Sequence, residues 1–123
     1  MKKNTFSLQA RALSFCHAFS GLKQLFKEPN MRIHIIATVA VIAAGIIRNI
    51  HRYQWMAILV SIALVWITEA FNTCVEMLCD YACDNKWHPV IKTIKDISAA
   101  AVLIAAILSV VVGTIIFISY LYI

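Results

Sequence analysis

The stretch ISAAAVLIAAILSVVVGTIIFI, residues 97–118, contains no charged side chain over a length that crosses a bilayer. A helical span needs about 20 apolar residues, because the helix rises about 1.5 Å per residue and the hydrocarbon core is about 30 Å thick. Lys95 and Asp96 precede the stretch, and Tyr120 and Tyr122 follow it as interfacial anchors. The sequence therefore predicts a membrane-spanning helix at about residues 95–119.

Two further apolar runs, residues 33–47 and 55–67, come before this stretch. With their helical flanks they predict spans at about residues 30–49 and 54–80. Hydrophobic residues make up 62% of the chain and the mean hydropathy is +0.81, well above the values of a soluble domain. A soluble fold of this size would leave large apolar patches in water, so we expect an all-α membrane protein with three transmembrane helices.

The segment at about residues 6–27 mixes leucine and phenylalanine with polar and basic side chains at near-helical spacing. This pattern predicts an N-terminal amphipathic helix on the cytoplasmic membrane surface. Pro29 then breaks the helix and allows a new one to start. No internal repeat or linker is visible, so we expect residues 1–123 to form a single domain.

The net charge of +5 is distributed unevenly along the chain. Basic residues cluster before the first apolar run and again at residues 86–95, whereas only Arg48 and Arg52 lie between the first two runs. The positive-inside rule places the N-terminus and residues 86–95 in the cytoplasm, and the C-terminus outside. A membrane orientation explains this distribution, so we expect a lipid bilayer and no nucleic acid as partner.

Polar side chains recur along the second predicted span as Glu69, Asn72, Glu76 and Asp80. At about 100° per residue they share a stripe roughly 80° wide on one helix face. Carboxylates at membrane depth are costly, so such a stripe faces a protein interior, a partner chain or a wet cavity. The positions of Glu28 and the later Lys95–Asp96 pair put them at the same cytoplasmic boundary.

Clustered carboxylates at this boundary suit Mg²⁺, which prefers oxygen ligands and is usually shared with substrate phosphates. Glu69, deeper in the apolar layer, could accept a proton from an alcohol at headgroup depth. Gly21, Gly45 and Gly113 are the only glycines, so the chain has neither a GxxxxGK[ST] loop nor a GxGxxG turn. The pattern thus predicts a metal-competent acidic site, and leaves open a non-catalytic ion- or proton-conducting membrane subunit.

Two motifs carry a resemblance to a known family. Residues 69–80, EAFNTCVEMLCD, resemble the E-x-x-N-[ST]-x-x-E-x-x-x-D signature of the prokaryotic diacylglycerol kinase family. Residues 95–103, KDISAAAVL, resemble the K-D-x-x-[AS]-A-A-V-L segment that opens the third span of that family. The resemblance covers nearly the whole chain and implies an ATP-dependent lipid kinase of the bacterial inner membrane, acting as a homotrimer with active sites shared between protomers.

The resemblance also implies roles for individual residues. Glu69 would be the general base toward the lipid hydroxyl, Glu28 and Glu76 would hold the Mg²⁺ that accompanies ATP, and Asn72 and Asp80 would support the site. The residues implied to bind the nucleotide with its metal are Arg11, His17, Glu28, Glu76, Lys86, Trp87, His88, Lys95 and Asp96. The family's N-terminal arginine aligns one position before Arg11, and His17 stands where the family usually has tyrosine.

The lipid substrate is the open point within the family, whose members phosphorylate either diacylglycerol or undecaprenol. We expect diacylglycerol to be converted to phosphatidic acid, with undecaprenol as the alternative. Residues 26–34 are similar to the Gram-positive-type members, some of which prefer undecaprenol. The two lipids each present a primary alcohol at headgroup depth, so the predicted catalytic residues do not indicate which of them is the substrate.

Cys79 and Cys83, four residues apart and followed by His88, suggest a zinc site at first sight. A structural zinc site needs a complete tetrahedral ligand set, and the predicted cytoplasmic side is reducing. We therefore expect these cysteines to be small apolar packing residues.

Overall fold

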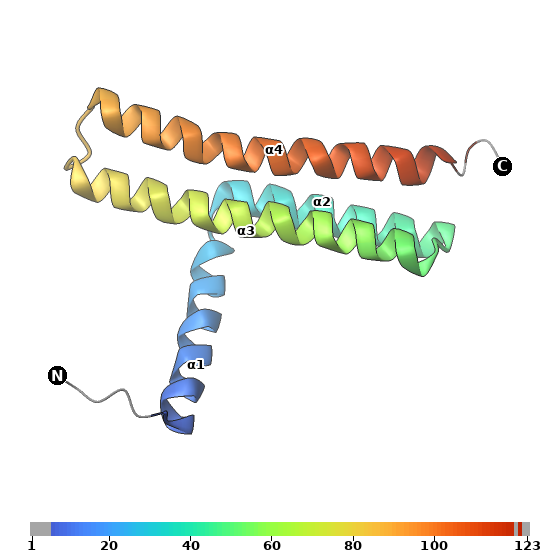
Figure 1. Ribbon diagram of the computed structural model, residues 1–123, viewed down its shortest axis with the longest axis horizontal. Helices are drawn as coiled ribbons and strands as arrows, with labels where there is room; N and C mark the ends of the chain where they lie inside the picture. Colours follow the sequence, from blue (N-terminus) through green and yellow to red (C-terminus); the bar gives the residue numbers. More distant parts are fainter. Residues whose placement is uncertain (1–5, 120, 122–123) are drawn as a thin grey trace.

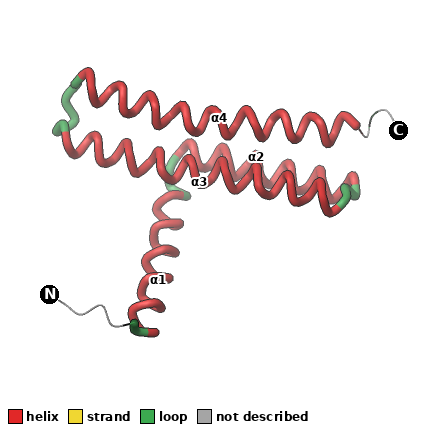
Figure 2. The backbone as a smooth tube through the Cα atoms, in the orientation of Figure 1, coloured by secondary structure: helices red, strands yellow, loops and turns green. Residues whose placement is uncertain are grey.

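The structure is a computed structural model that describes residues 6–119 and 121, and this part of the chain contains four helices and no strand. The helices are α1 (Leu8–Leu25), α2 (Pro29–Arg48), α3 (Arg52–Ala82) and α4 (Pro89–Ser119) (Figures 1 and 2). The last three are each long and apolar enough to cross a membrane. The predicted all-α class with three spans is confirmed. Tyr120 and Tyr122, the predicted interfacial anchors, lie outside the described residues, as do Lys2 and Lys3 of the basic cluster before the first apolar run.

The ends of the helices follow from local sequence. Pro29 occupies the first turn of α2, where its missing N–H costs no hydrogen bond. Asn49 ends the same helix in the left-handed conformation with φ 51°, which asparagine tolerates better than most residues. His51 is the N-cap residue of α3, and its backbone N–H donates to the side chain of Gln54 at 2.9 Å. A short turn thus joins α2 and α3 as antiparallel neighbours.

The two long helices extend beyond the membrane-sized helix α2. Each of α3 and α4 has 31 residues, or about 46 Å of helix, against about 30 Å of hydrocarbon core. Figure 1 shows the C-terminal part of α3 and the N-terminal part of α4 running side by side past the start of α2. Helix α4 begins at Pro89, six residues before the expected span, because its first turns are polar and lie outside the apolar run.

Helix α3 lies between the other two spans and supplies most of the buried side chains. A small core near the α2–α3 turn contains Ile50, Ile58 and Ile116, and the Ser109 hydroxyl of α4 donates to the Ser61 carbonyl of α3 at 3.2 Å. Most other large apolar side chains of the spans are exposed in the single chain. This is the pattern expected of helices whose outer faces are covered by lipid or by neighbouring protomers.

Helix α1 runs across the direction of the three spans and extends away from them (Figure 1). None of its residues is buried. Its C-terminal end is attached to α3 by an edge-to-face contact between the rings of Phe26 and Trp66, with centroids 5.8 Å apart. The orientation agrees with a helix lying on the membrane surface.

Gly45 is required by the close approach of α2 to the start of α3. A Cβ atom at this position would lie 2.7 Å from the Trp55 ring and 3.2 Å from Ile50. We expect Gly45→Ala to lower the free energy of unfolding by about 1–3 kcal/mol, as overpacking does in tightly packed sites. Thermal unfolding of the detergent-purified protein measures this effect.

Gly113→Ala is the matched control, because a Cβ atom at Gly113 meets nothing within 4 Å. This variant should unfold at or above the wild-type temperature, since alanine favours the helix over glycine. Equal melting temperatures for the Gly45→Ala and wild-type proteins would show that the ring of Trp55 does not restrict this position.

Candidate functional site

The predicted polar stripe lies on one face of α3 and turns toward the other two spans. Glu69 and Asn72 are buried, with 2% and 4% of their surfaces exposed. The Asn72 amide donates to the Glu76 carboxylate at 3.3 Å, one turn further along the helix. Helix periodicity thus places a buried carboxylate and a buried amide on the same face of α3 within the span.

These residues line a cavity of about 340 Å³ between the three spans, which we call the carboxylate cavity. Asn30 and His34 of α2 form one side of it, and small or medium apolar side chains of α4 form another. The full lining is Asn30, Ile33, His34, Glu69, Asn72, Glu76, Ala99, Val102, Leu103 and Ala106. The alanines of the 97–106 segment leave the space next to the carboxylates free.

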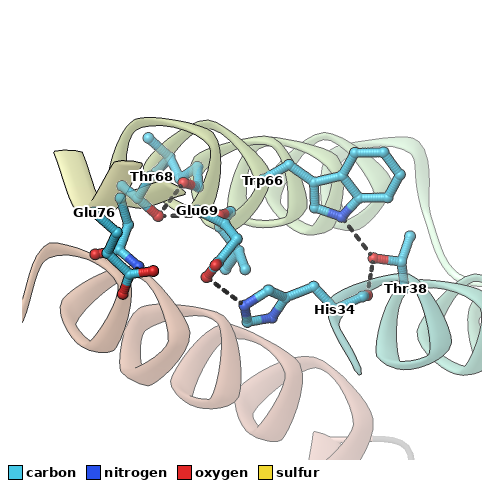
Figure 3. Close-up of polar contacts among 9 residues, drawn as sticks. His34, Thr38, Trp66, Thr68, Glu69 and Glu76 are labelled. Atoms are coloured by element: carbon cyan, nitrogen blue, oxygen red, sulfur yellow. Dashed lines mark hydrogen bonds and ion pairs between the residues drawn. The ribbon is translucent and has the colours of Figure 1, made fainter. Parts of the chain in front are cut away.

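Glu69 has a partner from a different helix that the sequence analysis did not identify. The Nε2 atom of His34 lies 3.1 Å from Oε2 of Glu69, and Figure 3 shows the imidazole of α2 directed at this carboxylate of α3. An ionisable residue near the start of a span was the available signal, because such residues are rare at membrane depth and seek partners. The two residues are 35 positions apart and lie on different helices, so helix periodicity cannot predict this contact.

A second cluster of charges lies where α3 and α4 extend beyond α2. The Lys95 ammonium group donates to the Asp80 carboxylate at 2.6 Å, and Lys92 donates to Asp96 at 2.6 Å. These side chains are between 36% and 63% exposed, so the pairs add little stability and their charges remain accessible to a ligand.

This cluster borders a cleft of about 370 Å³, which we call the charged cleft. Its walls come from the end of α3, the connection and the first turns of α4. The lining residues are Asp80, Cys83, Asn85, Lys86, Trp87, His88, Ile91, Lys92, Lys95 and Asp96. Asp80 is one helical turn from Glu76, so the charged cleft and the carboxylate cavity are neighbours along α3.

The structure thus brings together most of the predicted site residues, in two adjacent groups. Three predicted site residues are not part of these groups. Glu28 precedes α2 and makes no side-chain hydrogen bond or ion pair with the residues described. Arg11 and His17 are exposed on α1, and the Arg11 guanidinium lies 5.7 Å from the centroid of the Phe6 ring. These three do not line the carboxylate cavity or the charged cleft.

The cysteines show no arrangement for metal binding. Over residues 6–119 and 121, no group of three or more His, Cys, Asp or Glu side chains could hold a metal ion, and all four cysteines are free. Cys79 is buried, at 5% exposure, as expected of a small packing residue.

Cys79→Ala tests this interpretation. Because the change removes only a buried sulfur atom, we expect activity within about twofold of the wild type and a small loss of stability, on the order of 1 kcal/mol. The test measures the rate of the expected lipid phosphorylation and the zinc content of the purified variant. Loss of a bound metal together with activity would establish a metal role for this thiol.

The fold and these two cavities define an integral-membrane protein whose polar, ligand-accessible site lies at one end of its spans. Residues 16–117 match the family model of prokaryotic diacylglycerol kinase, and the chain belongs to this family of ATP-dependent membrane lipid kinases. The resemblance drawn from the two sequence motifs is thereby confirmed.

Two curated relatives illustrate the family. The chain is 34% identical over 115 residues to a diacylglycerol kinase of Synechocystis sp., covering 92% of this chain and 66% of that protein, just under two thirds of its length. It is also 34% identical over 105 residues to an undecaprenol kinase of Bacillus subtilis, covering 85% of each chain. The two relatives carry different substrate names at the same identity, so family membership does not select the lipid.

Proposed function

We propose that this protein transfers the γ-phosphate of ATP to the primary alcohol of a membrane lipid, with diacylglycerol as the first candidate and phosphatidic acid as its product. The observation that carries the proposal is the buried Glu69 carboxylate in a cavity next to the charged cleft. A proton acceptor at membrane depth and a set of phosphate-binding cations beyond it are the parts that such a transfer needs.

In the proposed reaction, the lipid hydroxyl oxygen attacks the γ-phosphorus and the bond from this phosphorus to the bridging oxygen of ADP breaks. Glu69 accepts the hydroxyl proton as the new phosphate ester forms. Its burial keeps water away from the reacting oxygen, which favours the lipid alcohol over hydrolysis as phosphate acceptor. Phosphoryl transfer otherwise depends on positioning and on neutralising the phosphate charge.

The residues around Glu76 fit a Mg²⁺ ion that accompanies ATP. The Oδ1 atom of Asn72 is buried without a hydrogen-bond partner in the described part of the chain, beside the Glu76 carboxylate. An unpartnered amide oxygen and a carboxylate are oxygen ligands of the type that Mg²⁺ binds. We assign Glu76 and Glu28 as metal ligands and Asn72 as their support; bound there, the ion would neutralise charge on the β- and γ-phosphates.

The charged cleft is the proposed nucleotide site. Lys95 and Lys86 supply cations for the phosphates, while Trp87 and His88 offer ring surfaces for the base. Asp80 orients Lys95 through their 2.6 Å hydrogen bond, and Asp96 holds Lys92 in the same way. Arg11 and His17 are assigned to the nucleotide as well.

Arg11, His17 and Glu28 line neither cavity in the single chain, which supports a site completed by a neighbouring protomer. We propose a homotrimer in which α1 of one protomer contributes to the site of the next. The exposed apolar faces of α2 and α4 supply the surface for such packing. We place the N-terminus and the site on the cytoplasmic side of the bacterial inner membrane, and the C-terminus outside.

The second candidate substrate is undecaprenol, favoured by the similarity to the Bacillus subtilis protein. Competition between diacylglycerol and undecaprenol in one mixed micelle, with limiting Mg-ATP, measures the ratio of their kcat/KM values. We expect diacylglycerol phosphorylation to dominate. A ratio that favours undecaprenol would reassign the substrate and leave the kinase chemistry intact.

A non-catalytic ion- or proton-conducting subunit is the alternative from another class. It would retain carboxylates inside the membrane but would need no nucleotide. Thermal unfolding with and without Mg-ATP distinguishes the kinase from the conducting subunit, because a ligand that binds only the folded state raises the melting temperature of the protein. We expect stabilisation by Mg-ATP; no shift at millimolar nucleotide would favour the conducting subunit.

A further inference from the structure

We propose that His34 is the positioning residue for Glu69, holding one carboxylate oxygen so that the other faces the lipid hydroxyl. This inference rests on the proposed kinase function and adds a residue to which no role has been assigned. It is carried by three features of the structure: the contact itself, the network behind it, and the place of His34 between two cavities.

The contact is selective for one oxygen of the carboxylate. His34 Nε2 lies 3.1 Å from Glu69 Oε2, and no other side chain of the described residues hydrogen-bonds or pairs with this carboxylate. A buried carboxylate without a partner is costly, so the imidazole N–H is a strong restraint on its position. Oε1 is left without a protein partner over the same residues, and is therefore the oxygen available to accept the substrate proton.

His34 is itself held by a network that joins α2 to α3. The Thr38 hydroxyl donates to the His34 carbonyl at 2.7 Å and accepts a hydrogen bond from Trp66 Nε1 at 3.0 Å (Figure 3). Trp66 precedes Glu69 by three residues on α3, and Thr38 follows His34 by four on α2. Residues near the same face of each helix thus make two cross-links about one turn apart, which fixes the depth of His34 relative to Glu69.

His34 also lies where two cavities meet. Besides the carboxylate cavity, it lines a largely apolar cavity of about 490 Å³ between α2, α3 and α4. The walls of the apolar cavity include Val41, Ile62, Val65 and Phe117. The imidazole therefore stands at the boundary between an apolar space and the reacting carboxylate, where the hydroxyl of a lipid has to be oriented.

A general base misplaced by about 1 Å loses up to about 10²-fold in rate, because proton transfer needs hydrogen-bond distance. His34→Leu removes the N–H and keeps an apolar side chain. We expect its kcat for lipid phosphorylation to fall about 10- to 100-fold, with the KM for Mg-ATP within about twofold of the wild type.

His34→Gln is the conservative variant, because its amide N–H can replace the imidazole N–H toward Glu69. It should recover kcat to within about fivefold of the wild type, which loss of packing alone would not produce. Wild-type kcat in His34→Leu, or equal kcat in the Leu and Gln variants, would overturn the inference.

If His34→Leu does not fold, His34→Ala with added imidazole replaces it as the test. Imidazole should raise the kcat of the Ala variant in a saturable way, and absence of any rise would overturn the inference. The wild type serves as the control in each assay. Absence of lipid phosphorylation by the folded wild type would contradict the proposed function. Wild-type activity in the residue-34 variants would contradict only the role of His34.

Discussion

Glu69→Gln is expected to abolish lipid phosphorylation while leaving Mg-ATP binding intact. Glutamine has almost the same shape as glutamate but accepts no proton at neutral pH, so it removes the general base and little else. Its carbonyl oxygen can still accept the hydrogen bond from His34 that the structure shows at 3.1 Å. General-base catalysis contributes about 10²–10⁴-fold, so kcat should fall by at least this range.

Single-turnover phosphate transfer and calorimetric titration with Mg-ATP measure the two properties separately. Thr68→Val is the matched control, because Thr68 is the neighbour of Glu69 and, among the described residues, its hydroxyl donates only to carbonyls of its own helix, Leu64 and Val65. This control should retain activity. Loss of nucleotide binding in Glu69→Gln would remove Glu69 from the base role and make it part of the nucleotide site.

Glu76→Gln should instead act on the nucleotide and its metal. The change removes the negative charge of the proposed metal ligand, next to the Asn72 Oδ1 atom that has no hydrogen-bond partner among the described residues. Loss of a hydrogen bond or ligand contact to a charged group costs about 1.5–3 kcal/mol, which corresponds to a roughly 10- to 150-fold weaker affinity. The Kd for ATP, measured over a range of Mg²⁺ concentrations, should rise by this factor.

Raising the Mg²⁺ concentration should partly restore binding in this variant, because mass action compensates for a weakened metal site. Asp84→Asn is the matched control: it removes a nearby negative charge from a residue that lines neither cavity and whose positive φ of 54° asparagine also adopts. Its ATP affinity should match that of the wild type. An unchanged Kd in Glu76→Gln would reject Glu76 as a metal ligand.

The three spans could be predicted from sequence because apolar runs of membrane length have few alternatives in a short chain. Hydropathy located the apolar part of α4 but not its start at Pro89, since the first turns of this helix are polar. Those turns contribute Lys92, Lys95 and Asp96 to the charged cleft. The polar first turns of α4 therefore shape the charged cleft, and hydropathy carries no signal for them.

The site was predictable where its residues share one helix. The spacing of Glu69, Asn72 and Glu76 places them on one face of α3 whatever the other helices do. The partnership of His34 with Glu69 could not be read from the sequence, because it depends on how α2 and α3 are staggered. The roles of Arg11 and Glu28 remain predictions, since neither residue lines the carboxylate cavity or the charged cleft.

The central claim is that this protein is a lipid kinase with Glu69 as its base. The most direct measurement is transfer of labelled γ-phosphate from Mg-ATP to lipid by the detergent-purified protein, with diacylglycerol and undecaprenol offered in parallel micelles, for the wild type and Glu69→Gln. We predict a labelled lipid phosphate with the wild type and none above background with Glu69→Gln. No lipid phosphate from either substrate, in wild-type protein shown to be folded and trimeric, would contradict the account.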